Sequence, residues 1–184
     1  MTTAHVVLVP DLGSGHLMSV IQAGVRMSSV VTVLLVHPLT PESAAKVAAQ
    51  VQRCTESSYY GSSVRFHHLP PVDPPPDPFP AGQVPALKSR YMQLCAPHVK
   101  AALAALRPAP DAILLDFFAT AVLDSATSAI PAYVYFTSTA AMLALMLRLP
   151  KLKEEEEEEV PQVLSAEILS HIPNRYHNCK NTNE

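Results

Sequence analysis

The stretch His5-Val-Val-Leu-Val-Pro-Asp-Leu-Gly-Ser-Gly-His16 decides the fold of this chain. Residues 6–9 are all apolar, which is typical of a strand that is covered on both faces. Leu12 to Gly15 then predict a turn, and from His16 to Met27 the apolar residues recur at helical spacing. A buried strand that passes through a glycine-containing turn into a helix is the opening unit of a parallel α/β sheet.

The same alternation of strand-like and helix-like runs continues outward along the chain. Thr40-Pro41-Glu42 predicts a helix start, with Thr as the cap, Pro at the first position and an acid in the first turn. Repeated strand–helix–strand units with buried strands predict a Rossmann-like, doubly wound parallel sheet. Strands are expected at 30–36, 64–69, 112–116 and 132–136, and helices at 41–53, 86–95, 101–106, 119–128 and 138–149, with a kink or restart at Pro97.

Composition divides the chain into one domain, 1–150, and an acidic, irregular tail, 151–184. Eight of the 18 prolines lie between Pro70 and Pro85, which predicts an extended loop. After Pro150 the six glutamates of 154–159 repel one another and predict a solvated segment.

Charge, hydropathy and cysteine usage exclude several classes of partner. A net charge of −3 without a basic cluster argues against nucleic acid. The apolar run Ala140 to Leu147 is too short to span a bilayer, so we expect no stable membrane insertion. Three cysteines without metal-binding or redox spacing favour a reducing, cytoplasmic setting.

Two polar residues fall at the ends of predicted strands: His16 follows the first and Asp116 closes the fourth. In an open parallel sheet, ligands bind beyond the carboxyl ends of the strands where the strand order reverses, so these side chains can meet. A neutral imidazole can then take a proton from a hydroxyl group while the carboxylate holds the other ring nitrogen. The alternative is structural, with a histidine at a helix start and an aspartate that caps the following helix.

Other motifs carry less. Gly13 and Gly15 suggest a dinucleotide fingerprint, but Met18 replaces its third glycine and no acid follows the second strand. The neighbours His67 and His68 point to opposite faces of a strand. His171 and His177 in the tail have no acid or thiol at ligand spacing apart from Cys179, and we predict no metal site.

Three blocks of sequence together resemble the plant UDP-glycosyltransferases, closest to the flavonoid and other phenolic glucosyltransferases. They are the opening stretch 5–17, the segment Leu114-Leu-Asp-Phe-Phe-Ala-Thr-Ala-Val-Leu-Asp124, and Pro131-Ala-Tyr-Val-Tyr-Phe-Thr-Ser-Thr139 running on to Pro150. The resemblance implies the N-terminal, acceptor-binding half of a GT-B type glycosyltransferase.

The resemblance also implies roles for single residues. His16 would be the general base towards a phenolic hydroxyl, with Asp116 as its charge partner. Ser14 and Thr137 match positions that contact the donor's phosphate and sugar. Phe117 and Phe118 match positions near a flat aromatic acceptor, and methionine suits such a pocket, so Met142 joins them. A UDP-sugar would be the co-substrate, with no other cofactor.

Departures from the family qualify this expectation. The family's C-terminal donor domain carries a motif with tryptophan, whereas this chain ends earlier and contains no Trp. We therefore expect an acceptor half that is truncated and inactive by itself, and UDP-sugar binding only if a donor domain is supplied. A non-catalytic module that binds small molecules or associates with a partner is the alternative, and an NAD-dependent oxidoreductase ranks below both.

Overall fold

The computed structural model describes residues 4–75, 84–123 and 130–155, except the side chains of Ser14, Pro85 and 153–155. The chain divides into two compact units, one comprising 1–78 and 88–137 and the other 79–87 and 138–184. The predicted domain boundary at residue 150 stays a prediction, and each unit is described by itself.

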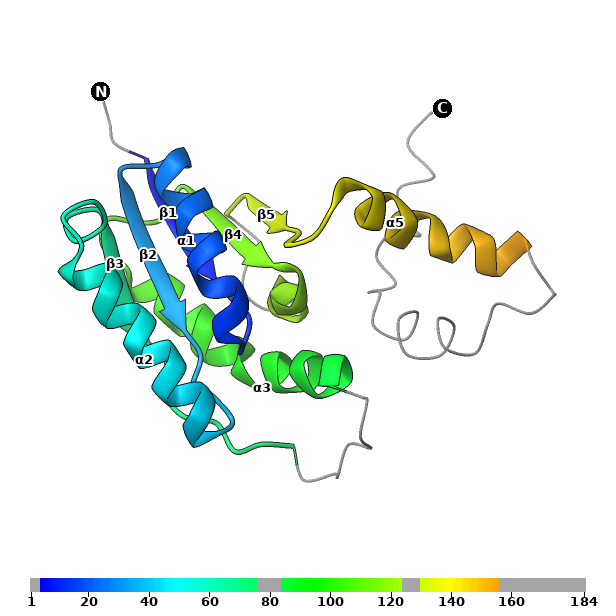
Figure 1. The fold of residues 1–184 in the computed structure, drawn as a ribbon, viewed down its shortest axis with the longest axis horizontal. Coiled ribbons are helices and arrows are strands. Elements are labelled where there is room, and N and C mark those ends of the chain that lie inside the picture. Colours follow the sequence, from blue (N-terminus) through cyan, green and yellow to red (C-terminus); the bar gives the residue numbers. More distant parts are fainter. Residues whose placement is uncertain (1–3, 76–83, 124–129, 156–184) are drawn as a thin grey trace. The chain divides into compact units, whose positions relative to one another are not determined.

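The first unit contains the predicted parallel sheet (Figure 1). Its strands are β1 (His5–Val9), β2 (Val30–Leu35), β3 (Val64–His68), β4 (Ala112–Asp116) and β5 (Ala132–Tyr135). They run in the order β3-β2-β1-β4-β5, with every neighbouring pair parallel. The chain first adds strands on one side of β1 and then crosses to its other side at β4, so the doubly wound fold predicted from the sequence is confirmed.

Helices cover both faces of this sheet, which explains why its central strands are apolar without alternation. Val7 and Val9 of β1 pack with Tyr91 of α3 (Val84–Ala105). Leu8 packs on the opposite face with Leu17 of α1 (Ser14–Met27), in a cluster that also includes Cys54 of α2 (Pro41–Glu56). Two apolar layers thus enclose β1, and the carboxyl end of the strand leads into the turn before α1.

A close approach between helix and strand fixes the position of α1. A Cβ atom added to Gly24 would lie 2.8 Å from both Cδ atoms of Leu8, whose side chain is fully buried. Only glycine permits this spacing without displacing the Leu8 side chain. The first turn of α1, which carries His16, is thereby held over the end of β1.

Two helix predictions meet different outcomes. Thr40 caps α2, because its hydroxyl accepts a hydrogen bond from the Ser43 amide at 3.2 Å and Pro41 follows. Of the kink or restart expected at Pro97, the restart is wrong, since α3 continues through this residue, and the kink stays a prediction. Pro97 is exposed, and so is Gln93, whose carbonyl loses its helical partner. Burial of neighbours such as Cys95 and Val99 holds the helix on the sheet.

The helix predicted at 119–128 is corrected for residues 119–122, and its part from 124 to 128 stays a prediction. A 3-10 helix, η1, starts directly after β4 and spans Phe117–Val122, while residues 124–129 lie outside the described part. In the second unit, α5 (Ala140–Glu155) continues past Pro150 into the first glutamates of the acidic run. The rest of the tail lies outside the described residues. None of the described helices is long and apolar enough to cross a membrane.

Candidate functional site

The topology brings two distant segments together at the carboxyl edge of the sheet. β1 and β4 are neighbours, and the strand order reverses between them. The turn after β1 leads into α1, whose third residue is His16, and β4 ends at Asp116. Open parallel sheets bind their ligands at such a reversal.

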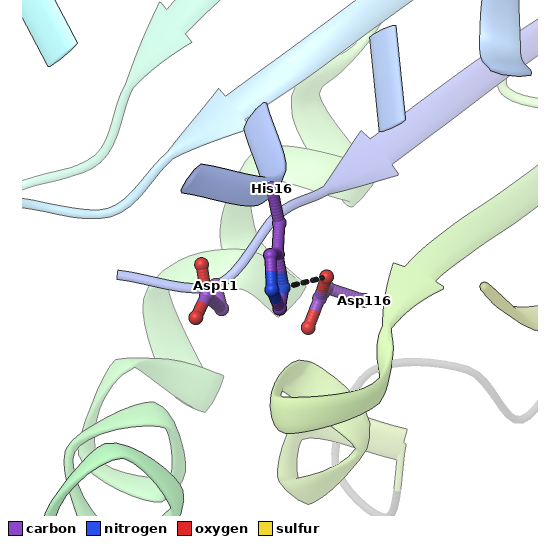
Figure 2. A group of neighbouring side chains, drawn as sticks. All are labelled: Asp11, His16 and Asp116. Carbon is purple, nitrogen blue, oxygen red and sulfur yellow. Dashed lines mark hydrogen bonds and ion pairs between the residues drawn. The ribbon is translucent and has the colours of Figure 1, made fainter. Parts of the chain in front are cut away.

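His16 and Asp116 form a hydrogen-bonded pair at this edge (Figure 2). The Nδ1 atom of His16 lies 2.9 Å from Oδ2 of Asp116. The Asp116 side chain is fully buried, whereas the His16 side chain is 30% exposed. The carboxylate can therefore hold the ring from within the protein while the imidazole stays accessible to a ligand.

The second oxygen of Asp116 fixes its orientation. Oδ1 accepts a hydrogen bond from the Phe118 amide at 3.0 Å, which caps η1. Asp116 thus performs both roles considered from the sequence, the cap and the histidine partner. Burial raises the pKa of the Asp116 carboxyl, and the charge of Asp11 adds to the rise, while the hydrogen bonds from Phe118 and His16 oppose it.

Thr137 completes the surroundings of the imidazole. Its hydroxyl oxygen lies 3.0 Å from Nδ1 and 3.2 Å from Nε2 of His16. When Nδ1 carries the proton that is donated to Asp116, the Nε2 lone pair can accept a hydrogen bond from a hydroxyl group. The Thr137 contact shows that an O–H group can reach this nitrogen.

Aromatic side chains lie next to the ring. The Phe118 ring is nearly parallel to the His16 ring, at 22°, with their centroids 6.2 Å apart. Phe117 contacts Phe118 and Phe136 edge to face, with centroids 5.5 and 5.3 Å apart. The phenylalanine rings therefore form an apolar, aromatic wall beside the imidazole, and such a wall suits a flat ligand.

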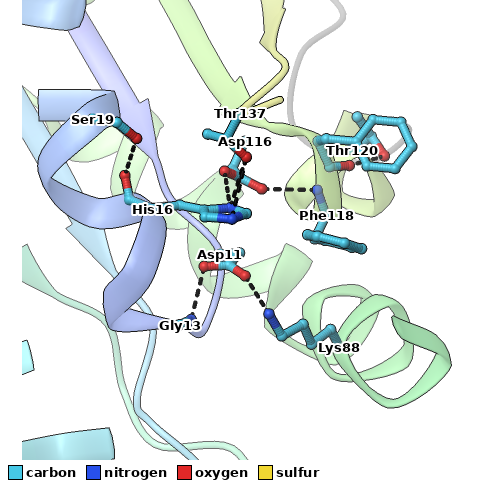
Figure 3. A network of polar contacts seen from close by, with 10 residues as sticks. Asp11, Gly13, His16, Ser19, Lys88, Asp116, Phe118, Thr120 and Thr137 are labelled. Carbon is cyan, nitrogen blue, oxygen red and sulfur yellow. Dashed lines mark hydrogen bonds and ion pairs between the residues drawn. The ribbon is translucent and has the colours of Figure 1, made fainter. Parts of the chain in front are cut away.

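Two charged residues that the sequence did not single out also belong to the site (Figure 3). The Asp11 carboxylate, with 1% of its side chain exposed, accepts hydrogen bonds from the Gly13 amide at 2.8 Å and from the Lys88 ammonium at 2.6 Å. Lys88 also lies 4.9 Å from the centre of the Phe118 ring. Asp11 could have been noticed, since it stands in the turn before α1, but nothing in the sequence marks Lys88.

Asp11, His16 and Asp116 each offer a ligand atom, and these atoms lie within 4.8 Å of one another. By distance alone they could hold a metal ion. However, both Asp11 oxygens are already engaged, one with a backbone amide and the other with an ammonium group. We therefore interpret the cluster as a hydrogen-bond network, and the use of no metal stays a prediction.

The structure does not place the side chains of the two remaining predicted residues beside the imidazole. Ser14 begins α1, and its side chain lies outside the described part of the chain. Met142 lies on α5 in the second unit, so its part in an acceptor pocket stays a prediction. The structure brings together His16, Asp116, Thr137, Phe117 and Phe118 in the first unit.

No protein-family model matches the chain. Among curated proteins, a malvidin galactosylase of Oryza sativa subsp. indica is 38% identical over 182 residues, which cover 94% of this chain and 36% of that protein. A UDP-glycosyltransferase of Stevia rebaudiana is 31% identical over 82% of this chain and 33% of its own length. The chain thus spans about a third of the length of the curated relatives that it matches.

Solved structures agree with this similarity. A UDP-glucosyltransferase of Polygonum tinctorium, capable of glucosylating indoxyl, matches with a TM-score of 0.70 and 25% identity. The match covers 86% of this chain and 35% of that one. A second structure, LpCGTa in complex with UDP, matches with a TM-score of 0.67 and 26% identity over 87% of this chain and 36% of its own. The fold corresponds to the N-terminal half of the GT-B architecture.

Proposed function

We propose that this chain supplies the residues that activate the acceptor hydroxyl group in a sugar transfer, because it belongs to the plant UDP-glycosyltransferases over the part that it spans. The donor is a UDP-sugar and the acceptor is a flavonoid, an anthocyanidin or another phenol. One observation carries this proposal: the His16–Asp116 pair at the strand reversal, with Nε2 within reach of a hydroxyl group.

The geometry suits proton transfer from an acceptor. Asp116 holds the proton on Nδ1, so Nε2 accepts the proton of the acceptor hydroxyl as the oxygen attacks the anomeric carbon of the sugar. A carbon–oxygen bond forms there, and the bond from that carbon to the UDP oxygen breaks, which inverts the configuration. The buried carboxylate then stabilises the imidazolium that has formed.

The neighbouring side chains divide between the two substrates. Phe118 and Phe117 form the wall beside which a flat phenol ring lies, as their contacts with His16 and with each other favour. Thr137 and Ser14 contact the phosphate or sugar of the donor. Because the names of relatives include both a galactosylase and glucosyltransferases, glucose is our proposal for the sugar rather than a property of the family.

We propose that the reaction needs no cofactor beyond the UDP-sugar and that the protein acts in the cytoplasm. The segments of the relatives that match this chain make up about a third of their length. The transfer reaction is therefore best tested in a chimera, in which residues 4–150 of this chain replace the matching segment of the rice malvidin galactosylase. The assay follows sugar transfer to malvidin, with UDP-galactose and UDP-glucose compared as donors.

We expect the chimera to transfer sugar and His16→Gln to lower its rate by about 10²- to 10⁴-fold, the usual contribution of a general base. His67→Gln is the matched control, since His67 is exposed on β3. Equal rates for the two variants would refute His16 as the base. A chimera that binds malvidin but transfers nothing would favour the alternative, a non-catalytic binding module.

A further inference from the structure

The Asp11–Lys88 ion pair is a feature of the site that the proposed reaction does not use. Its ammonium–carboxylate distance is 2.6 Å, and the side chains are 24% and 1% exposed for Lys88 and Asp11. A surface pair on α2, Lys46 with Glu42, has the same distance but side chains that are 60% and 79% exposed. Only the first pair is sheltered from solvent, where charges act strongly on their neighbours.

The His16 ring lies between two carboxylates (Figures 2 and 3). Asp116 is hydrogen-bonded to Nδ1, and Asp11 has an oxygen within 4.8 Å of a ring nitrogen. Two anions at this distance would together favour the imidazolium form, which cannot accept a proton. Both distances are at most about half of the screening length of about 10 Å at 0.1 M salt, so ions in solution do not remove the effect.

Lys88 offsets one of these two anions. Among the described residues, the ionisable groups beside the ring are Asp11 from the turn before α1, Asp116 from β4 and Lys88 from α3. With Lys88 in place the three carry one net negative charge, and without it they carry two. The glycine at position 13 leaves room for this ion pair. A Cβ atom there would lie 3.2 and 3.3 Å from the Asp11 oxygens and 3.5 Å from the Lys88 ammonium.

We propose that Asp11 and Lys88 are positioning residues that set the protonation state of His16. The Lys88 ammonium cancels the Asp11 charge, so that Asp116 alone governs the ring and Nε2 stays open to an acceptor proton. Neither residue needs to touch a substrate for this role. The inference rests on the proposed function for its purpose, but it concerns the chain by itself and can be tested without any transfer reaction.

The test measures the proton occupancy of the His16 ring in the whole chain by nitrogen NMR of ¹⁵N-histidine-labelled protein, through a pH series from 6.0 to 8.5. The signal is assigned by its loss in His16→Gln. Lys88→Met should raise the occupancy at pH 7.5 at least threefold, because an unopposed Asp11 favours the imidazolium. Asp11→Asn should lower it at the pH where half of the wild-type rings are protonated, because the Lys88 charge is then unopposed.

The opposite signs separate a charge effect from a structural one. Asp11→Asn keeps an oxygen for the Gly13 amide, and the double variant Asp11→Asn with Lys88→Met should return the His16 occupancy to within a factor of two of wild type. Lys46→Met is the matched control and should change nothing. Shifts of the same sign in both single variants, or no shift in either, would overturn the proposal. If the variants shift the His16 occupancy as expected but the chimera transfers no sugar, only the proposed function is refuted.

Discussion

Replacing Asp116 with Asn separates the charge of this residue from its shape. The amide oxygen can still accept the hydrogen bond from the Phe118 amide, which Asp116 now receives at 3.0 Å. The amide nitrogen then faces Nδ1 of His16, where Asp116 now lies at 2.9 Å, and can only donate. We therefore expect the ring to switch tautomer, so that Nδ1 accepts and Nε2 carries the proton.

The same substitution should change how stability depends on pH. Burial raises the pKa of the Asp116 carboxyl in the folded chain, so the folded state binds its proton more tightly than the unfolded state does. The resulting contribution to stability is present below the unfolded pKa, about 4, and is lost as the pH rises through the folded pKa. Each unit of that rise corresponds to about 1.4 kcal/mol.

Asn does not titrate, so the free energy of unfolding of Asp116→Asn, relative to wild type, should increase between pH 3.5 and the range above the folded pKa. Against this gain stands the weakening of two charge-assisted hydrogen bonds, about 1 kcal/mol each. Urea unfolding at a series of pH values measures the difference, and nitrogen NMR of the imidazole reports the tautomer. A free-energy difference that moves in favour of wild type as the pH rises would contradict the assigned cost of burying this charge. An unchanged tautomer would contradict the assigned role of Asp116.

Three further predictions concern the scaffold. Gly24→Ala should lower the free energy of unfolding by about 1–3 kcal/mol, because its Cβ would meet the buried Leu8 side chain. Gly15→Ala is the control and should not lower it, since no neighbouring atom lies within 4 Å of the added Cβ. Urea unfolding compares the two variants. Tyr91→Phe should cost about 1–3 kcal/mol in the same assay, because the one proton of the Tyr91 hydroxyl is shared between two backbone carbonyl oxygens, 3.2 and 3.1 Å away. Burial raises the pKa of the Cys95 thiol to about 11, so about one thiol in a thousand is ionised at pH 8. Iodoacetamide should therefore label Cys95 only in the unfolded chain. Rapid labelling of the native chain, detected by mass spectrometry, would refute the burial of this thiol.

The sequence predicted the sheet because β1, β2 and β4 are largely continuous apolar runs, as expected of strands that are covered on both faces. That fold in turn predicted the meeting of His16 and Asp116, since it places the ends of β1 and β4 side by side at the reversal of strand order. Thr137 and the two phenylalanines followed from the family resemblance, and the structure places them beside the imidazole.

The rest depended on tertiary contacts that local patterns do not contain. The continuation of α3 through Pro97 depends on which side of the helix faces solvent. The short η1 helix begins at once after β4 because the Asp116 side chain caps it. Lys88 is one of many scattered cations in the sequence, and only the packing of α3 shows that it reaches Asp11.

The most direct test of the proposed site is a titration of the ¹⁵N-histidine-labelled chain with a flavonol, followed at the His16 ring nitrogens. We predict that the Nε2 signal moves with saturation as the phenolic hydroxyl approaches, that the His67 signals stay in place, and that Phe118→Ala weakens the binding. Binding of the flavonol without any change at Nε2 of His16 would contradict the proposal that this nitrogen receives the acceptor's proton.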